Sequence, residues 1–127
     1  KYTRFGVGND LLDNAKSVKR ILCPARDAYD KYNEILNACK KQNQDVLFLI
    51  ALGPTATVLA HDLCNEGFQA IDIGHLDIEY EWFLQHADKK CAVPNKWVNE
   101  TDDIVTNEND TLHDDEYENS IICEIKI

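Results

Sequence analysis

Four short apolar runs predict the β-strands of this chain. These runs are residues 18–23, 46–52, 69–73 and 120–127. Each is bounded by polar or turn-forming residues, and segments of this kind form strands. The run at 46–52 is continuously apolar, which is typical of a central parallel strand buried on both faces.

Patterns with helical spacing separate these runs. Apolar residues recur every three or four positions over residues 28–39, which predicts an amphipathic helix. A second helix is expected over residues 54–66, because Pro54 suits a first helical turn and Gly67 suits a helix end. A third helix, over residues 76–86, carries bulky apolar side chains.

The order of these elements predicts the fold class. Strands that alternate with helices of this length favour a Rossmann-like, three-layer α/β/α fold with a mainly parallel sheet. A chain of 127 residues can bury one core but not two, so we expect a single domain over residues 1–127. Ligands of such sheets lie beyond the carboxyl ends of the strands, and Gly53 and Gly74 follow two such ends.

The charge of the chain is negative but unevenly distributed. The net charge is −10, yet residues 1–99 hold 12 basic and 13 acidic residues. Residues 100–118 hold nine acidic residues and neither lysine nor arginine, so we expect this segment to be an irregular, solvated stretch. Because the sequence offers no basic face, we expect no nucleic-acid partner.

Cysteine usage and hydropathy favour a cytoplasmic protein. The five cysteines form no C-x-x-C pair, so a structural zinc site is not expected. Cys23, Cys39 and Cys64 are expected to behave as small hydrophobic residues in a reducing cytosol. No apolar run approaches the ~18 residues that span a bilayer. The sequence begins at Lys1 and contains no methionine, as in a fragment or a processed product.

The first candidate site is the turn Gly53-Pro54-Thr55-Ala56-Thr57. Free N–H groups at a helix N-terminus, with the positive end of the helix dipole, stabilise an anion such as phosphate. Gly53 lets a ligand approach the backbone, and the hydroxyls of Thr55 and Thr57 can add hydrogen bonds. The turn is neither a Walker loop nor a full dinucleotide fingerprint, so an ordinary strand-to-helix turn is the favoured alternative.

The second candidate site is an acidic cluster after the third strand. Asp77, Glu79 and Glu81 stand beside His75, and Mg²⁺ or Mn²⁺ prefers carboxylates together with phosphate oxygens. In an extended segment Asp77 and Glu79 would share one side, whereas in a helix Asp77 and Glu81 share a face. An acidic first turn that only complements the helix dipole is the alternative, and both stay open. His75 is interpreted first as a capping residue or a structural hydrogen-bonding group, and second as a metal ligand, an acid or a base.

The third candidate site is the N-terminal loop Arg4-Phe5-Gly6-Val7-Gly8-Asn9-Asp10. Its arginine suits a diphosphate, because a guanidinium can form two parallel hydrogen bonds with phosphate oxygens. The alternative is an ordinary surface arginine. The loop therefore adds a positively charged candidate site to the uncharged turn at residues 53–57 and the acidic cluster at residues 77–81.

Three segments in order carry a family resemblance: RFGVGNDLLDNAKSVKRILCPARDAYDKYNEIL, ALGPTATVLAHDL and QAIDIGHLDIEYEWFL. They resemble the GT-D fold glycosyltransferases, bacterial enzymes that extend glycans on serine-rich adhesins or build surface polysaccharides. The likeness covers about Arg4 to Leu84. It implies a metal-dependent enzyme with a Rossmann-like fold that moves a sugar from a UDP-sugar donor to a glycan or glycoprotein acceptor.

The resemblance also implies a set of site residues. A divalent ion, Mn²⁺ or Mg²⁺, would be held near a D-x-E motif, which falls on Asp77 and Glu79. Beyond the resemblance, the base that activates the acceptor hydroxyl must lie within hydrogen-bond reach of it, and the candidates for this role are Glu81 and His75. The candidates for nucleotide and diphosphate contacts are Arg4, Gly6, Gly8, Asn9, Asp10, Gly53, Pro54, Thr55, Ala56 and Thr57.

Two alternative functions stay open. The chain resembles only the C-terminal half of a GT-D catalytic domain, so it is expected to carry part of the machinery. A non-catalytic nucleotide-binding module is therefore one alternative. A methyltransferase that uses S-adenosylmethionine is the other, and it would need an acidic residue such as Asp72 to hold the ribose. His61 also departs from the aromatic residue that the family leads us to expect at that helix position.

Overall fold

The computed structural model describes residues 3–98, 100–101 and 114–127. These residues form two compact units, each with its own hydrophobic core. The first unit comprises Arg20–Gly74 and Ile122–Ile127, and the second comprises the described residues of Tyr2–Lys19 and His75–Ile121. That the two units make up a single domain stays a prediction.

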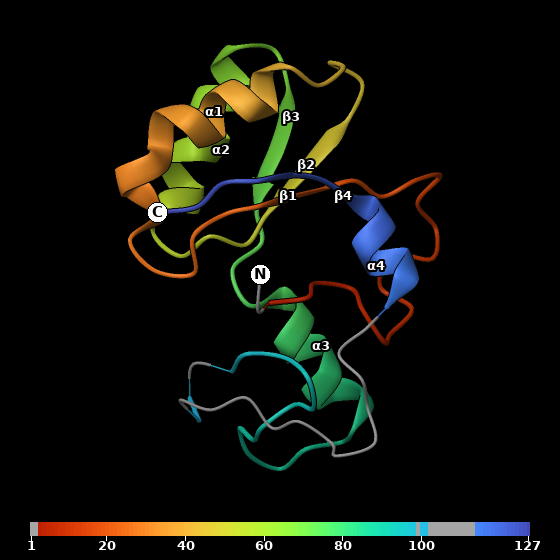
Figure 1. The fold of residues 1–127 in the computed structure, drawn as a ribbon. Helices are drawn as coiled ribbons and strands as arrows, with labels where there is room; N and C mark the ends of the chain where they lie inside the picture. Colours follow the sequence, from red (N-terminus) through yellow and green to blue (C-terminus); the bar gives the residue numbers. More distant parts are fainter. Residues whose placement is uncertain (1–2, 99, 102–113) are drawn as a thin grey trace. The chain divides into compact units, whose positions relative to one another are not determined.

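The first unit alternates strands and helices (Figure 1). Its elements are β1 (Arg20–Leu22), the 3-10 helix η1 (Ala28–Lys31), α1 (Tyr32–Lys40), β2 (Leu47–Ile50), α2 (Thr55–Asn65), β3 (Gln69–Asp72) and β4 (Ile121–Glu124). The second unit contains α3 (Leu76–Leu84) and α4 (Asp115–Ser120). All four predicted strands are present in shortened form, and so are the three predicted helices. None of the described helices is long and apolar enough to cross a membrane.

The strands form two separate pairs. β2 and β3 are parallel, with Leu47 opposite Gln69 and Ile50 opposite Asp72. A parallel pair needs a crossover connection, which α2 supplies. β1 and β4 pair with each other. The predicted α/β class with parallel strands is confirmed, although the described strands make two two-stranded sheets and not one larger sheet.

One face of the β2–β3 pair is covered and the other is exposed. α1 and α2 lie on the same side of the two strands (Figure 1). The core between them consists of Ala28, Ile35, Cys39, Ile50, Ala56, Leu59, Leu63, Phe68 and Ile125. On the strands Leu47, Leu49 and Ile71 are 50%, 41% and 50% exposed. The expectation that β2 is buried on both faces is therefore wrong for the described residues, because strand side chains alternate and the helices cover one side only.

The end of α2 confirms the role predicted for Gly67. Its φ of 90° lies in the left-handed region, where a side chain is disfavoured. The N–H groups of Gly67 and Phe68 donate to the carbonyls of Cys64 and Leu63, at 3.0 Å each. This Schellman arrangement satisfies the last helical carbonyls and turns Phe68 into the core.

The acidic segment contains a helix that the sequence interpretation missed. Residues 100–118 were expected to be irregular, but α4 begins at Asp115, so the expectation is wrong there. The Asp114 carboxylate caps this helix by accepting the Tyr117 N–H at 2.8 Å, and further acidic residues follow in the first turn. Residues 102–113 of the segment lie outside the described residues.

The cysteines are free and differ in burial. Cys39 is buried in the first core, whereas Cys64 is exposed on α2. The expectation of a small hydrophobic role is thus confirmed for Cys39 and wrong for Cys64. Burial raises the pKa of the Cys39 thiol to about 12 and that of Cys23 to about 11.

We predict that iodoacetamide at pH 8 alkylates Cys64 well before Cys39. The thiolate is the nucleophile, and a raised pKa keeps the Cys39 thiol protonated until the pH approaches that value. Peptide mass spectrometry of the native protein, with a urea-denatured sample as control, measures both sites. Equal rates for Cys39 and Cys64 in the native protein would contradict the burial of Cys39.

Candidate functional site

α3 decides which acidic residues of the second unit lie together. The segment after His75 is helical, so Asp77 and Glu81 share one face and Glu79 points away from it. His75 occupies the N-cap position, but its side chain makes no capping hydrogen bond. Capping by the His75 side chain is therefore wrong, whereas a structural hydrogen bond and its roles as a metal ligand, acid or base stay predictions.

The shared face of α3 holds a buried ion pair. The Asp77 side chain is 2% exposed, and one of its oxygens accepts the Lys96 ammonium at 2.7 Å. Lys96, itself 4% exposed, also donates to Glu81 at 3.0 Å. We call Asp77, Glu81, Lys96 and the donors Asn9 and Gly6 the Asp77–Lys96 cluster.

The N-terminal loop is attached to this cluster. The second Asp77 oxygen accepts the Gly6 N–H at 2.9 Å and the Asn9 side-chain amide at 3.0 Å. The same amide donates to Glu81 at 2.7 Å. Farther along the loop, Asp10 accepts the Tyr80 hydroxyl at 2.6 Å. The predicted ligand contacts Gly6, Asn9 and Asp10 are thus used, in this arrangement, to hold the loop against α3.

Two loop glycines serve different purposes. Gly6 has a φ of 70°, and a Cβ there would lie 2.5 Å from the Leu12 side chain. Gly8 has a φ of 78°, and a Cβ there would meet nothing within 4 Å. Gly6 is therefore required by the conformation and by packing, whereas Gly8 leaves open space beside the backbone.

A cavity of about 410 Å³ adjoins the loop and the cluster. Its volume falls within the range of small-molecule sites. It is lined by Arg4, Val7, Gly8, Glu81, Gln85, Val93, Pro94, Asn95, Lys96 and Asp114. The cavity brings together three predicted site residues, Arg4, Gly8 and Glu81. The Arg4 guanidinium lies 5.4 Å from the centre of the Tyr117 ring, in a cation–π arrangement.

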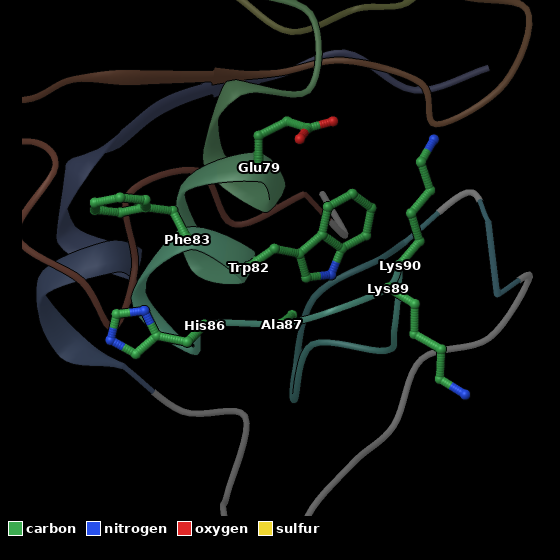
Figure 2. Close-up of a pocket in the computed structure, with 7 residues that line it drawn as sticks. All are labelled: Glu79, Trp82, Phe83, His86, Ala87, Lys89 and Lys90. Atoms are coloured by element: carbon green, nitrogen blue, oxygen red, sulfur yellow. The ribbon is translucent and has the colours of Figure 1, made fainter.

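The opposite side of α3 borders a second cavity of about 460 Å³ (Figure 2). Its lining residues are Glu79, Trp82, Phe83, His86, Ala87, Lys89 and Lys90. The Trp82 side chain is held in place beside this cavity, because its indole N–H donates to the Cys91 carbonyl at 2.9 Å. Lys90 pairs with Glu100 at 3.1 Å, and this hydrogen bond lowers the Glu100 pKa. Predicted metal ligand Glu79 thus borders a different cavity from Glu81, and Asp77 lines neither cavity.

The geometry bears directly on the predicted metal ligands. Both oxygens of Asp77 already accept protein donors, and Glu79 lies on another face of α3. Among the described residues no group of three or more His, Cys, Asp or Glu side chains is arranged to hold a metal. The present arrangement does not fit one ion ligated by both Asp77 and Glu79. Metal binding by these residues stays a prediction.

The turn at residues 53–57 belongs to the first unit. Gly53 and Gly74 follow the adjacent ends of β2 and β3, as predicted. Asp72 links the two turns, because its carboxylate accepts the Thr57 hydroxyl at 2.8 Å and the Gly74 N–H at 3.1 Å. Thr55 is buried. Phosphate binding by this turn therefore stays a prediction, with the Thr57 hydroxyl already engaged.

Comparison with known proteins identifies the family. The sequence profile of the family "Glycosyltransferase GT-D fold" matches residues 1–101. The chain belongs to the GT-D fold glycosyltransferases. It is 51% identical over 94 residues to the "Probable glycosyl transferase Gly" of Streptococcus gordonii, covering 74% of this chain and 14% of that protein. It is 38% identical over 123 residues to "Glycosyltransferase GlyD" of Streptococcus pneumoniae serotype 4, covering 97% of this chain and 15% of that one.

Solved structures agree with this family. One, described as the domain of unknown function 1792 with a distinct glycosyltransferase fold, has a TM-score of 0.87 and 42% sequence identity to the present chain. Another, a glycosyltransferase from Streptococcus sanguinis, has a TM-score of 0.88 and 42% identity. The matches cover 98% of this chain but 44% and 46% of the solved chains. The chain thus spans less than half of the structures that it matches and about one seventh of the curated relatives.

Lys96 is the site residue that the sequence interpretation missed. It was counted only in the charge balance, although it stands between the apolar residues Val93, Trp97 and Val98. A single cation among apolar residues signals a buried, paired charge, because lysine is rarely buried without a partner. The sequence could therefore have indicated burial, but not which carboxylates pair with it.

We predict that Asp10 controls the ionisation of Tyr80. The hydrogen bond from the Tyr80 hydroxyl to Asp10 raises the Tyr80 pKa, so the phenol keeps its proton to a higher pH than usual. In Asp10→Asn, the Tyr80 pKa should fall toward its ordinary value. Ultraviolet titration near 295 nm measures it, and Tyr80→Phe identifies the signal. An unchanged titration in Asp10→Asn would mean that the two side chains do not pair in solution.

Proposed function

We propose that this chain forms part of the donor site of a glycosyltransferase that transfers sugar from a UDP-sugar to a glycan or glycoprotein. One observation carries the proposal: in a GT-D family chain, Arg4 lines the same cavity as Gly8, which leaves backbone space open. A cation beside an open glycine backbone suits the oxygens of a diphosphate.

The proposed chemistry follows from where charge develops. Breaking the bond between sugar and phosphate leaves negative charge on the departing UDP, and a cation held beside it, here Arg4, stabilises that charge. Arg4 can form two hydrogen bonds to a diphosphate if its guanidinium moves from the Tyr117 ring. Glu81 borders the same cavity and is our candidate for the acceptor base, with His75 as the second candidate.

A divalent ion, Mn²⁺ or Mg²⁺, is a separate part of the proposal. When bound, such an ion would supply Lewis-acid neutralisation of the diphosphate. Because Asp77 and Glu79 lie on different faces of α3, we assign no step to an ion held by both. Glu79 is the more accessible of the two ligands, since its carboxylate has no hydrogen bond or ion pair among the described residues.

A non-catalytic nucleotide-binding module is the second candidate function. It is favoured by the pairing of the acidic residues, because Asp77 and Glu81 already accept hydrogen bonds from Asn9 and Lys96. The methyltransferase alternative loses its support, because the Asp72 carboxylate that would hold a ribose instead holds Thr57 and Gly74. Sugar transfer by the intact protein, compared with UDP binding by this chain alone, separates the enzyme from the binding module.

We predict that Arg4→Gln weakens UDP binding by about 10- to 100-fold. Charge-assisted hydrogen bonds contribute about 1.5–3 kcal/mol, and each 1.4 kcal/mol is a factor of ten in affinity. Isothermal titration calorimetry with UDP measures the effect. Arg26→Gln removes an exposed arginine of the first unit and should bind like the parent chain. Equal affinity in Arg4→Gln and Arg26→Gln would remove Arg4 from the proposed site.

The metal part makes a prediction of its own. Chelation should abolish transfer by the intact enzyme, and Mn²⁺ should restore it. Glu79→Gln should raise the Mn²⁺ needed for half-maximal activity about tenfold, which corresponds to about 1.4 kcal/mol of binding free energy, without changing the melting temperature. Asp88→Asn, an exposed carboxylate of the same unit, is the control. Full activity in the presence of chelator would contradict any metal requirement.

A further inference from the structure

Among the described residues, Lys96 is the only cation that contacts Asp77 and Glu81, the two carboxylates on one face of α3. Its ammonium lies 2.7 Å from Asp77 and 3.0 Å from Glu81, and all three side chains are largely buried. Two carboxylates and one ammonium carry one more negative than positive charge. The Gly6 N–H and the Asn9 amide stabilise this charge by donating hydrogen bonds to the carboxylate oxygens. Without Lys96, two like charges would face each other one helical turn apart, away from water.

The N-terminal loop depends on where these carboxylates point. Gly6 and Asn9 both donate to the Asp77 oxygen that faces away from Lys96, and Asn9 also bridges to Glu81. If either carboxylate turned toward water, the loop would lose hydrogen-bond acceptors that lie about 70 residues away in the sequence. Arg4 and Gly8 belong to the same loop and line the cavity. The charge on Lys96 and the shape of the cavity wall are thus connected through two hydrogen-bonded residues.

We propose that Lys96 is a positioning residue for donor binding, and that Asp77 in this arrangement anchors the 4–10 loop. The Lys96 ammonium fixes both carboxylates, the carboxylates fix Gly6 and Asn9, and the loop then presents Arg4 and Gly8 to the cavity. The donor-binding part rests on the proposed function, whereas the ordering of the loop does not. A cation bound at Asp77 from solution would have to displace the Lys96 ammonium.

The test measures loop order and ligand binding in the same variants. Lys96→Met removes the charge at similar length, Lys96→Arg retains the charge, and Lys16→Met removes an exposed lysine of the same unit as control. Amide hydrogen exchange reports loop order at Gly6, whose N–H is bonded to Asp77. Exchange at Ala87, whose N–H is bonded to the Trp82 carbonyl after α3, reports folding of the second unit, and exchange in α2 reports folding of the first. Calorimetry gives the UDP affinity, and the intact enzyme gives KM for the donor and kcat.

We expect Lys96→Met to speed exchange at Gly6 at least tenfold, leave exchange at Ala87 and in α2 unchanged, and weaken UDP binding at least tenfold. Lys96→Arg should recover part of both losses. In the intact enzyme KM should rise tenfold while kcat changes less than threefold. If Lys96→Met does not fold, Lys96→Arg still decides: faster Gly6 exchange with weaker UDP binding supports the proposal.

Two results would overturn the proposal. The first is parental exchange at Gly6 in a folded Lys96→Met protein, because the loop would then not depend on the ammonium. The second is faster Gly6 exchange with unchanged UDP affinity, because loop order would then not serve the donor. If the parent chain binds no UDP at all, the proposed function fails, and Gly6 exchange still tests whether Lys96 orders the loop.

Discussion

The organisation of the second unit depends on a buried ion pair between Asp77 and Lys96. Removing one partner from such a pair costs about 3–5 kcal/mol, a large part of the about 5–15 kcal/mol that stabilises a typical domain. The pair also joins chain segments that are far apart in sequence, because Gly6 and Asn9 donate to Asp77 while Lys96 comes from the segment after α3. Local packing around Ile78, Trp82, Val93 and Val98 completes the unit.

Helical geometry determines what the acidic motif can do. In a strand, Asp77 and Glu79 would face one ligand together, but in α3 their directions differ by about 200° at 3.6 residues per turn. Asp77 therefore shares the Lys96 ammonium with Glu81 and accepts hydrogen bonds from the loop, while Glu79 borders the second cavity. The same three carboxylates would form one site in a strand and a different site in a helix. Motif spacing alone does not assign ligands until the secondary structure is known.

Features with a local physical cause were the ones that the sequence could predict. Helix periodicity, Pro54 at the start of α2 and Gly67 at its end all act within a few residues, and α2 lies where they indicated. The cap of α4 is equally local, yet the acidic composition around Asp114 concealed it. Burial of β2 was predicted wrongly, because whether Leu47 and Leu49 are covered depends on what packs over the strand and not on the strand itself.

The site was predictable only in part, because its contacts are between residues distant in sequence. Arg4, Gly8 and Glu81 could be nominated from residue chemistry, and they line one cavity. The role of Lys96 could not, because nothing local links it to Asp77, 19 residues earlier. The side chain of Asn9 was assigned to a ligand for the same reason, although its two carboxylate partners lie 68 and 72 residues away.

The Asp77–Lys96 cluster contains charged side chains because the loop that it holds needs hydrogen-bond acceptors. Apolar packing of similar volume is often as stabilising as a buried ion pair, or more so. It could not, however, accept the Gly6 N–H or the Asn9 amide, and a buried donor without an acceptor is costly. Arg4, Gly6 and Gly8 all have positive φ, so the loop has little regular structure of its own to define its path. Directional acceptors on α3 supply that definition, and the buried Lys96 ammonium holds those acceptors in place.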